Sequence, residues 1–411
     1  MRARRSARGV LTLVWFATAC AHGPASLTEN APAGGRSSAA RVAGPLDVDA
    51  DAPEIRDHPT LRARLRATPH GYYRFINAAF TREVCRRFEH VKHLQPAVTL
   101  HGDCHLEQYA VTELGRGLTD FDDSAGGPPH VDLVRFGVSL HLAARQRGWG
   151  TEAHSIYLAF MRGYERALRD PRAEAPPPEL ARRIAASFKE DRATTLARSD
   201  ALMELLPERD PELDAARREM VLSQVARDAG LPESYFHIKK MGLLRIGIGS
   251  ALSAKYLLRV EGPSDAADDD VMLEAKEILS REGLACIQVT TGPSRIFTGE
   301  QRLAYQPFRF PGVLHVGGKT FWVHAWTDYY VELDIQKSLR SPDEMREVAF
   351  DVGVQLGRGH PKRVDEEDGT RLRLEILRSL PNEQIRKQIM SLTEETIAAW
   401  NRFKSKTPSG P

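Results

Sequence analysis

Residues 101–123 read HGDCHLEQYAVTELGRGLTDFDD, and this window holds two His and four Asp together with Glu and Gln side chains. Such a density of imidazole and oxygen groups fits three interpretations: divalent-metal binding, general base catalysis, or a solvated loop. The apolar runs in VTLHGD and LTDFDD predict two short strands, the first of them ending in a loop. The segments around the window have to decide between the three interpretations.

The segments on either side of the window have helical periodicity. Apolar residues recur at three- and four-residue intervals from Leu61 onward, through YYRFINAAFTREVCRRFEHV. After the window, VDLVRFGVSLHLAARQRG and SIYLAFMRGYERALRD predict two amphipathic helices. A Pro-rich break, EAPPPE, precedes a charged helical stretch from about Leu180 to Asp228.

A change of period separates the helical part from a β-rich part. HIKKMGLLRIGIGSALSAKYLLRVEG alternates around a Gly-containing turn and predicts a β-hairpin, and VMLEAKEI and FWVHAWTD predict further strands. The helical period returns at Pro342, and a last helical hairpin ends near Lys404. We therefore predict an α+β chain with helices over 56–230, a β-rich part over 236–335, and helices over 340–405 that complete the first part.

The composition is that of a globular protein. Of 411 residues, 42% are hydrophobic and 27% are charged, which is enough to bury a normal core. Lys and Arg number 57 against 55 Asp and Glu, for a net charge of +2. This balance gives no reason to expect nucleic acid or an anionic membrane surface as a partner.

The amino terminus is typical of an export signal. MRARRSARG supplies four Arg, VLTLVWFATA is an apolar run of ten, and Cys20 follows small residues. A run of ten is too short to span a bilayer as a helix. Residues 1–20 resemble a signal peptide with a lipobox-like end, so we expect lipid attachment at Cys20, a flexible linker over 21–55, and an exported lipoprotein on the bacterial cell envelope. Secretion without a lipid, and a cytoplasmic start with a chance apolar run, are the alternatives.

The other cysteines are Cys85, Cys104 and Cys286. Three thiols allow at most one disulfide, and we expect all three to be unlinked. The absence of a CxxC pair argues against a structural zinc site.

The spacing within the window suits phosphoryl transfer. Gln108 follows Asp103 by five residues, and Asp120 follows Gln108 by twelve. A phosphotransferase needs one carboxylate to orient and deprotonate the attacking hydroxyl, an oxygen ligand for magnesium, and a second carboxylate that bridges the metals. These three residues stand in the order of those roles.

The β-rich part offers groups for the phosphates. Gly247 and Gly249, beside Ser250, lie in the predicted hairpin, where small residues allow close phosphate approach. Lys276 lies in the strand LEAKE, from which its ammonium could reach phosphate oxygens. Taken singly, such a hairpin is usually only a turn, and such a lysine usually faces solvent.

The chain order is reversed relative to protein kinases and aminoglycoside phosphotransferases, in which the Gly-rich hairpin and the lysine precede the catalytic loop. A circular permutation would explain the reversal. The helix ending VQLGRGH supports it, because a similar helix directly precedes the catalytic loop of aminoglycoside phosphotransferases, and here it follows the β-rich part.

From about Thr68 to Arg363 the chain resembles the bacterial proteins grouped as domain of unknown function 2252, within the protein-kinase-like superfamily. The segments that carry the resemblance are TPHGYYRF, HGDCHLEQYA, LTDFDDSAGGPPHVDLVRFGVSL, LLRIGIGSALSAKYLLRVEG, LEAKE and AFDVGVQLGRGH. The resemblance implies a two-lobe kinase-like fold in permuted order, with ATP and Mg²⁺ as cofactors.

The resemblance also implies roles for single residues. Asp103 would be the catalytic base, with His101 and His105 beside it, and Asp120 the metal-bridging carboxylate. The remaining residues would support the loop or bind metal or cofactor: Glu107, Gln108, Asp122, Gly247, Gly249, Ser250, Lys276 and Glu300, the last as partner of Lys276. Asp132 and Arg135 would brace the loop through a buried ion pair.

Two departures from the family pattern keep other functions open. Gln108 stands where the family usually has Asn, which displaces the amide oxygen, and Leu252 replaces an expected hairpin glycine. The sequence predicts a phosphotransferase acting on an unknown hydroxyl acceptor. One alternative is a degenerate lipoprotein that binds a ligand or partner, which an ATP-poor exported compartment also suits. The other is a metal-dependent hydrolase using His101, Asp103, His105 and Asp122.

Overall fold

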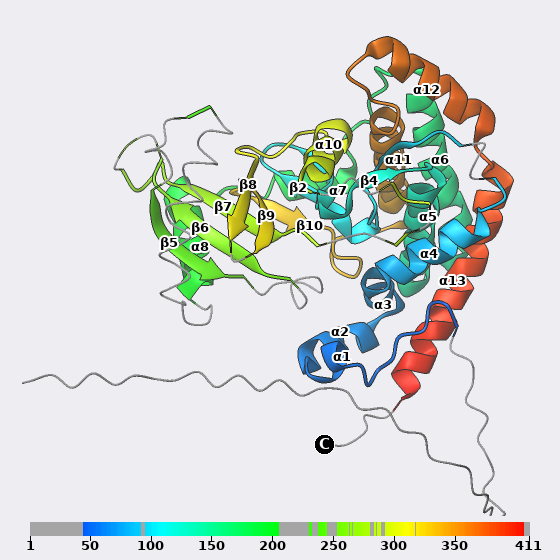
Figure 1. The fold of residues 1–411 in the computed structure, drawn as a ribbon, viewed down its shortest axis with the longest axis horizontal. Coiled ribbons are helices and arrows are strands. Elements are labelled where there is room, and N and C mark those ends of the chain that lie inside the picture. Colours follow the sequence, from blue (N-terminus) through cyan, green and yellow to red (C-terminus); the bar gives the residue numbers. More distant parts are fainter. Residues whose placement is uncertain are drawn as a thin grey trace, which may run out of the picture. The chain divides into compact units, whose positions relative to one another are not determined.

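The computed structural model describes residues 44–406 apart from 92–94, 205–229, 232–236, 245–252, 263, 265, 280–282, 285, 289–291 and 317. All of them belong to the compact unit Ala43–Pro411. Helices and strands together form an α+β fold, as predicted (Figure 1). Cys20, Gly247, Gly249, Ser250 and Leu252 lie outside the described residues.

Most of the helices belong to the two helical parts of the sequence. They are α1 (Pro53–Arg56), α2 (Pro59–Ala67), α3 (Pro69–Phe75), α4 (Asn77–Arg87), α5 (His130–Gln146), α6 (Ala153–Arg169), α7 (Glu179–Ala185), α8 (Arg192–Glu204), α11 (Pro342–Gly359), α12 (Glu366–Ser379) and α13 (Asn382–Ser405). A further helix, α10 (Ser294–Leu303), lies within the β-rich part and was not predicted. The charged helical stretch expected from about Leu180 to Asp228 is divided, because α7 ends at Ala185 and α8 starts at Arg192, and its part from 205 to 228 lies outside the described residues.

Helix α11 packs closely along α6, although the two are far apart in sequence. A Cβ added at Gly163 of α6 would lie 2.2 Å from the carbonyl oxygen of Phe350, and one added at Gly353 of α11 would lie 2.1 Å from that of Phe160. Only glycine fits such an approach of two backbones. The contact joins the C-terminal helical part to the helices that follow the window.

Two small sheets hold the window. Strand β1 (Val98–Leu100) pairs with β4 (Ala125–Gly127), and β2 (Tyr109–Thr112) lies between β3 (Arg116–Leu118) and β10 (Tyr330–Glu332). Helix α11 is tied to β2 and β3 through buried side chains. Asp351 accepts hydrogen bonds from Tyr109 Oη at 2.7 Å and from Arg116 Nε at 2.8 Å, and Gln355 Oε1 accepts one from Leu118 N at 2.7 Å.

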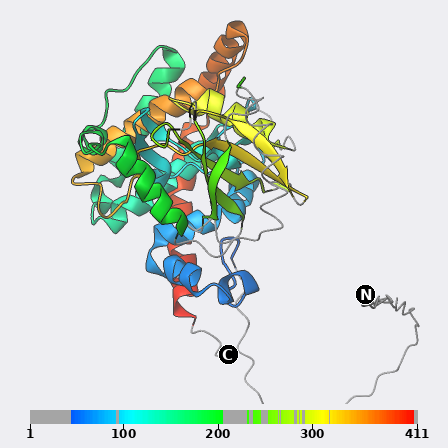
Figure 2. The same cartoon turned by 90° about the vertical axis from the view of Figure 1, so that its left-hand side faces the viewer.

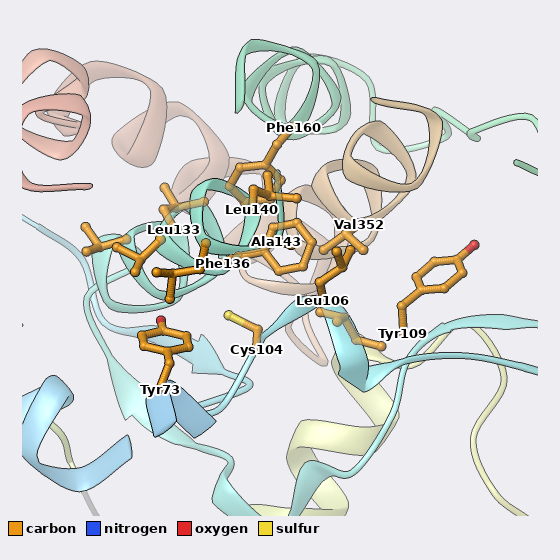
Figure 3. Packing of buried hydrophobic residues seen from close by; sticks show 14 of the residues in the cluster. Tyr73, Cys104, Leu106, Tyr109, Leu133, Phe136, Leu140, Ala143, Phe160 and Val352 are labelled. Atoms are coloured by element: carbon orange, nitrogen blue, oxygen red, sulfur yellow. The ribbon is translucent and has the colours of Figure 1, made fainter. Parts of the chain in front are cut away.

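The window also contributes directly to the helical core. Figure 3 shows Cys104 and Leu106 pointing toward α5, where Leu133, Phe136 and Leu140 lie. All five side chains are buried. The window is therefore not a solvated loop.

The LTDFDD segment does not form the predicted strand. Strand β3 ends at Leu118, and a single helical turn covers Phe121–Asp123. Between them Asp120 has φ +63°, in the left-handed region that non-glycine residues adopt only where the surrounding structure holds them. The consequence is a sharp turn between β3 and the helical turn Phe121–Asp123.

The β-rich part forms one antiparallel sheet in the order β5-β6-β7-β9-β8. Its strands are β5 (Ile238–Leu243), β6 (Lys255–Val260), β7 (Val271–Glu277), β8 (Gly312–Val316) and β9 (Lys319–Ala325). Alternation along the strands gives the sheet two faces. Leu258 and Leu273 pack in the core of one face, whereas Leu257 and Met272 contact Leu196 of α8 on the other. Figure 1 and Figure 2 show α8 beside the sheet.

A disulfide joins Cys85 of α4 to Cys286, with 5.3 Å between the two Cα atoms. The expectation of three unlinked thiols is therefore wrong, and Cys104 is the buried free cysteine. The pair is separated by 201 residues in sequence, so its proximity depends on the tertiary fold. Among the described residues, no helix combines the length and apolar character needed to cross a membrane.

Candidate functional site

Asp132 holds the His-Gly-Asp turn in place. Its carboxylate accepts hydrogen bonds from the backbone N–H groups of His101 at 2.7 Å and Gly102 at 3.0 Å. It also contacts His360 Nε2 at 3.1 Å, at the end of α11. Burial would raise the pKa of Asp132, but the bonds to His360 and the other donors outweigh it and lower the pKa. A fully buried carboxylate therefore stays charged and fixes the turn.

Asp103 is held through one of its two carboxylate oxygens. Arg135 donates to Asp103 Oδ1 from Nε at 2.7 Å and also from Nη2. The Arg135 guanidinium is fully buried and lies 4.5 Å above the ring centre of Tyr73. The expected ion pair between Asp132 and Arg135 is therefore wrong, because each of the two braces a different part of the turn.

His101 and His105 do not converge on one point. His101 Nε2 bonds to the carbonyl oxygen of Thr119 at 2.9 Å, and its Nδ1 lies 3.4 Å from the backbone N of Asp103. His105 is buried, with Nε2 3.8 Å from Asp103 Oδ2, and burial and nearby cations such as Arg74 hold its pKa well below the usual range. His101 joins the turn to the residue before Asp120, and neutral His105 lies behind Asp103.

Lys276 meets two carboxylates of the window. Its Nζ lies 2.5 Å from Asp120 Oδ1 and 2.8 Å from Asp122 Oδ2, and the lysine is only 7% exposed. Gln108 Nε2 points to the other oxygen of Asp120 at 3.4 Å. The fold thus brings Lys276 together with Asp120 and Asp122, which are more than 150 residues away in sequence. The phosphotransfer interpretation required this contact for Asp120, and it also required Asp103 to lie in the same cleft.

The charges at this contact depend on one another. Burial alone would raise the pKa of Asp120, but the Lys276 ammonium outweighs it and holds that pKa well below its usual range. Burial and the adjacent charge of Asp120 raise the pKa of Asp122 to about 6. Burial would lower the pKa of Lys276, but the carboxylates raise it well above its usual value. The lysine is a permanent cation between two acids of unequal strength.

Glu300 does not pair with Lys276. Its buried carboxylate accepts a hydrogen bond from Phe308 N, and burial raises its pKa. Helix α10 supports the acidic turn in another way, because Arg295 donates to the carbonyl oxygens of Asp122 and Ser124. The expectation that Glu300 is the partner of Lys276 is therefore wrong.

The two halves of the window are packed against each other. Asn77 Nδ2 donates to the carbonyl oxygen of Gly102 at 3.2 Å and to Asp123 Oδ2 at 2.7 Å. Gly102 has φ +81°, and a Cβ there would lie 2.0 Å from the Asp123 carbonyl oxygen. Glycine is required at this contact, which sets the Asp103 turn beside the turn that carries Asp120 and Asp122.

Sequence reasoning missed three residues beside Lys276. Glu274 precedes it by two positions on the same face of β7, and its carboxylate contacts Lys255 Nζ at 2.7 Å and His324 Nε2 at 3.3 Å. Burial would raise the pKa of Glu274, but Lys255 and His324 outweigh it and lower the pKa. The alternation in LSAKYLLRV and LEAKE could have indicated that both lysines share a face, but only the strand register identifies them as neighbours.

The oxygen donors suit magnesium better than zinc. Within the described part of the chain, no group of three or more His, Cys, Asp and Glu side chains is arranged to hold a metal ion. Asp120, Asp122 and the amide of Gln108 supply hard oxygen ligands, and magnesium is often held by one or two carboxylates with phosphate oxygens completing its shell. The two histidines of the window do not point toward a common ion, which disfavours the metal-dependent hydrolase.

Residues 56–212 match a family described as an uncharacterized protein conserved in bacteria (DUF2252). This match supports the family resemblance drawn from the motifs, and it covers Asp103, Gln108, Asp120 and Asp122 but not Lys276. The chain matches no curated protein and no solved structure.

Proposed function

We propose that this chain is a phosphotransferase with a kinase-like site, which transfers a phosphoryl group from a donor such as ATP, bound with Mg²⁺, to the hydroxyl of an acceptor. The observation that carries the proposal is the contact of Lys276 with Asp120 and Asp122 beside the turn of Asp103. Phosphoryl transfer needs a cation for phosphate, carboxylates for metal and a base within one small volume.

The sheet supports a kinase-like fold. In protein kinases the phosphate-binding lysine lies on the third strand, and a helix that supplies a glutamate follows. Here Lys276 lies on β7, the third strand of the five-stranded sheet, and α10 follows with Glu300. Because α11 packs on α6 and bonds to β2 and β3, we propose a two-lobe fold in circularly permuted order.

The residues of the site fit the roles that the reaction requires. Asp120, Asp122 and Gln108 would hold Mg²⁺, which neutralises charge on the phosphate oxygens when bound. Asp103 Oδ1 is fixed by Arg135, and Asp103 Oδ2 accepts the proton of the acceptor hydroxyl. The acceptor oxygen forms its bond to phosphorus as the bond from phosphorus to the donor's leaving oxygen breaks. Lys276 binds oxygens of the donor phosphates.

The test is replacement of the proposed base. Asp103→Asn keeps the size of the side chain but cannot accept the proton, so we expect phosphoryl transfer to water or an acceptor to fall about two to four decades with donor affinity unchanged. The matched control is Asp334→Asn, a partly exposed carboxylate that pairs with Lys337. An Asp103→Asn enzyme as fast as the wild type would refute the assignment.

One observation favours a second function. Active kinases require the ion pair of the strand lysine with the helix glutamate, whereas Glu300 here bonds to Phe308 N. A degenerate protein that binds a ligand or partner would keep such a geometry, and the substitutions Gln108 and Leu252 point the same way. Donor binding without turnover in the wild-type protein distinguishes this function from catalysis.

We further propose that the chain is exported and anchored to the cell envelope by a lipid on Cys20. The disulfide between Cys85 and Cys286 supports export, because disulfides persist in oxidising compartments and are rare in the cytosol. Exported compartments hold little ATP, so the chemical class of the phosphate donor has to be inferred from the residues of the site.

A further inference from the structure

A second lysine lies beside Lys276. Lys255 begins β6, and its Cα is the register partner of the Lys276 Cα on β7. Directly opposed residues of antiparallel strands place their side chains on the same face. The Lys255 side chain is 16% exposed and contacts Glu274 Oε1 at 2.7 Å, and its charge also acts on Asp120. Two lysine side chains thus leave the same face of the sheet at opposed positions, where donor phosphates would bind.

The neighbouring part of this face is polar. Glu274 is opposed on β9 by His324, whose Nε2 lies 3.3 Å from the Glu274 carboxylate. The His324 ring packs against the rings of both Phe308 and Trp322, with each ring centre 4.3 Å from that of His324. The Phe308 and Trp322 rings are therefore packed against His324.

Helix α8 covers the apolar part of the sheet face that carries Lys255 and Lys276. Beyond Glu274, Leu257 and Met272 are buried against Leu196 of α8. A nucleotide base needs a flat slot with apolar walls. Among the described residues on this face, the positions next to the lysines carry Glu274, His324 and Trp322. Trp322 is opposed to Lys276 but is only 1% exposed, so its ring is buried in the core, and Leu257 and Met272 lie under α8.

We infer that Lys255 is a second phosphate-binding residue and that the site recognises its donor through a chain of linked phosphates rather than through a base. This inference rests on the proposed function and specifies its donor class. The chemistry is that of a polyphosphate, either inorganic or carried by a nucleotide. In the free protein Glu274 balances Lys255, as Asp120 and Asp122 balance Lys276.

Phosphoryl transfer from a polyphosphate to a hydroxyl accounts for every bond and proton. The terminal P–O–P anhydride bond breaks, the terminal phosphoryl group joins the acceptor oxygen, and Asp103 receives the hydroxyl proton. The donor leaves shortened by one phosphate. The reaction requires no oxidant or reductant, and inorganic polyphosphate could serve where ATP is scarce.

The experiment measures binding by calorimetry with the disulfide-intact protein and Mg²⁺, using inorganic tripolyphosphate, ATP and adenosine as separate ligands. We expect tripolyphosphate and ATP to bind with dissociation constants within about threefold of each other, and adenosine not to bind. Lys255→Met should weaken tripolyphosphate binding at least about tenfold, and Lys255→Arg should retain it. The matched control is Lys319→Met, because Lys319 lies on the same sheet, is 54% exposed and pairs with Glu277.

The outcomes separate the two proposals. If ATP binds but tripolyphosphate does not, or if adenosine binds as tightly as ATP, phosphate-chain recognition is overturned and the phosphotransferase proposal stands. If Lys255→Met is folded by circular dichroism and binds tripolyphosphate like the wild type, the role of Lys255 is overturned. If Lys255→Met does not fold, the affinities of the wild-type protein for tripolyphosphate, ATP and adenosine test phosphate-chain recognition on their own. Failure of both ATP and tripolyphosphate to bind would remove the proposed function as well.

Discussion

Replacing Lys276 with Met tests the ion-pair arrangement at the centre of the site. The Nζ group lies within 2.8 Å of carboxylates from both Asp120 and Asp122, and the lysine is buried. Removing one partner of a buried ion pair costs about 3–5 kcal/mol, because the other charge stays buried without a counter-ion. The Asp120 and Asp122 side chains are 32% and 24% exposed, which places the expected cost at the lower end, about 3 kcal/mol. We expect a loss of that size, which is a large fraction of the roughly 5–15 kcal/mol that stabilises a typical native protein.

Mg²⁺ should reverse much of this loss. With the ammonium gone, the two carboxylates are available to a divalent cation, and a ligand at about 100 times its dissociation constant stabilises the folded state by about 2.7 kcal/mol. The assay is urea denaturation followed by circular dichroism, with and without MgCl₂. Lys319→Met is the control and should change stability by less than about 1 kcal/mol, because Lys319 is 54% exposed.

Two results would refute the reasoning. The first is a Lys276→Met variant within about 1 kcal/mol of the wild type, which would mean that the two carboxylates do not need the lysine. The second is a destabilised variant whose stability does not respond to Mg²⁺, which would leave the proposed metal ligands without support. Neither result depends on knowing the acceptor.

Three further predictions concern stability and export. Replacing Cys85 and Cys286 together with Ser should lower the free energy of unfolding by about 3–5 kcal/mol, since the disulfide closes a loop of 201 residues; equal denaturation midpoints with and without reductant would contradict this. The pKa of Glu107 is lowered to about 2, because its contacts with His70 and with the Arg74 guanidinium outweigh burial, so stability should fall by about 3 kcal/mol as pH drops from about 4.5 to 2, and Glu107→Gln should flatten that part of the pH profile. Fatty-acid labelling of the full-length protein should disappear in Cys20→Ala, and equal labelling of both proteins would exclude the lipid anchor.

The helices and the sheet could be predicted because their patterns are local. The 3.6-residue period marks α5 and α6, and alternation marks β6 and β7, independently of what each packs against. LTDFDD failed because its apolar residues suggested a strand, while Asp120 adopts φ +63° under constraints from the surrounding fold. The charged stretch after Leu180 was predicted as helical, but helical composition does not reveal the break between α7 and α8.

Part of the site could also be predicted because it depends on a local sequence pattern. The spacing of Asp103, Gln108 and Asp120 within one window is a local pattern, and the structure brings two of these residues, Gln108 and Asp120, within 3.4 Å of each other. The partner of each charge could not be predicted. Asp132 and Arg135 are three residues apart on one helix, yet Arg135 bonds to Asp103 while Asp132 bonds to backbone N–H groups, because the preceding turn offers both.

The free protein balances its lysine with the same carboxylates that a metal would require. Lys276 is buried, and a buried ammonium without a counter-charge is strongly disfavoured. Asp120 and Asp122 can therefore leave the lysine for a metal only when phosphate oxygens replace them at Nζ. A metal alone would compete with the lysine, and a phosphate alone would face two uncompensated carboxylates. It follows that metal and phosphate should bind together more tightly than either binds alone, and that the Lys276 contact favours a phosphate donor that arrives already bound to its metal.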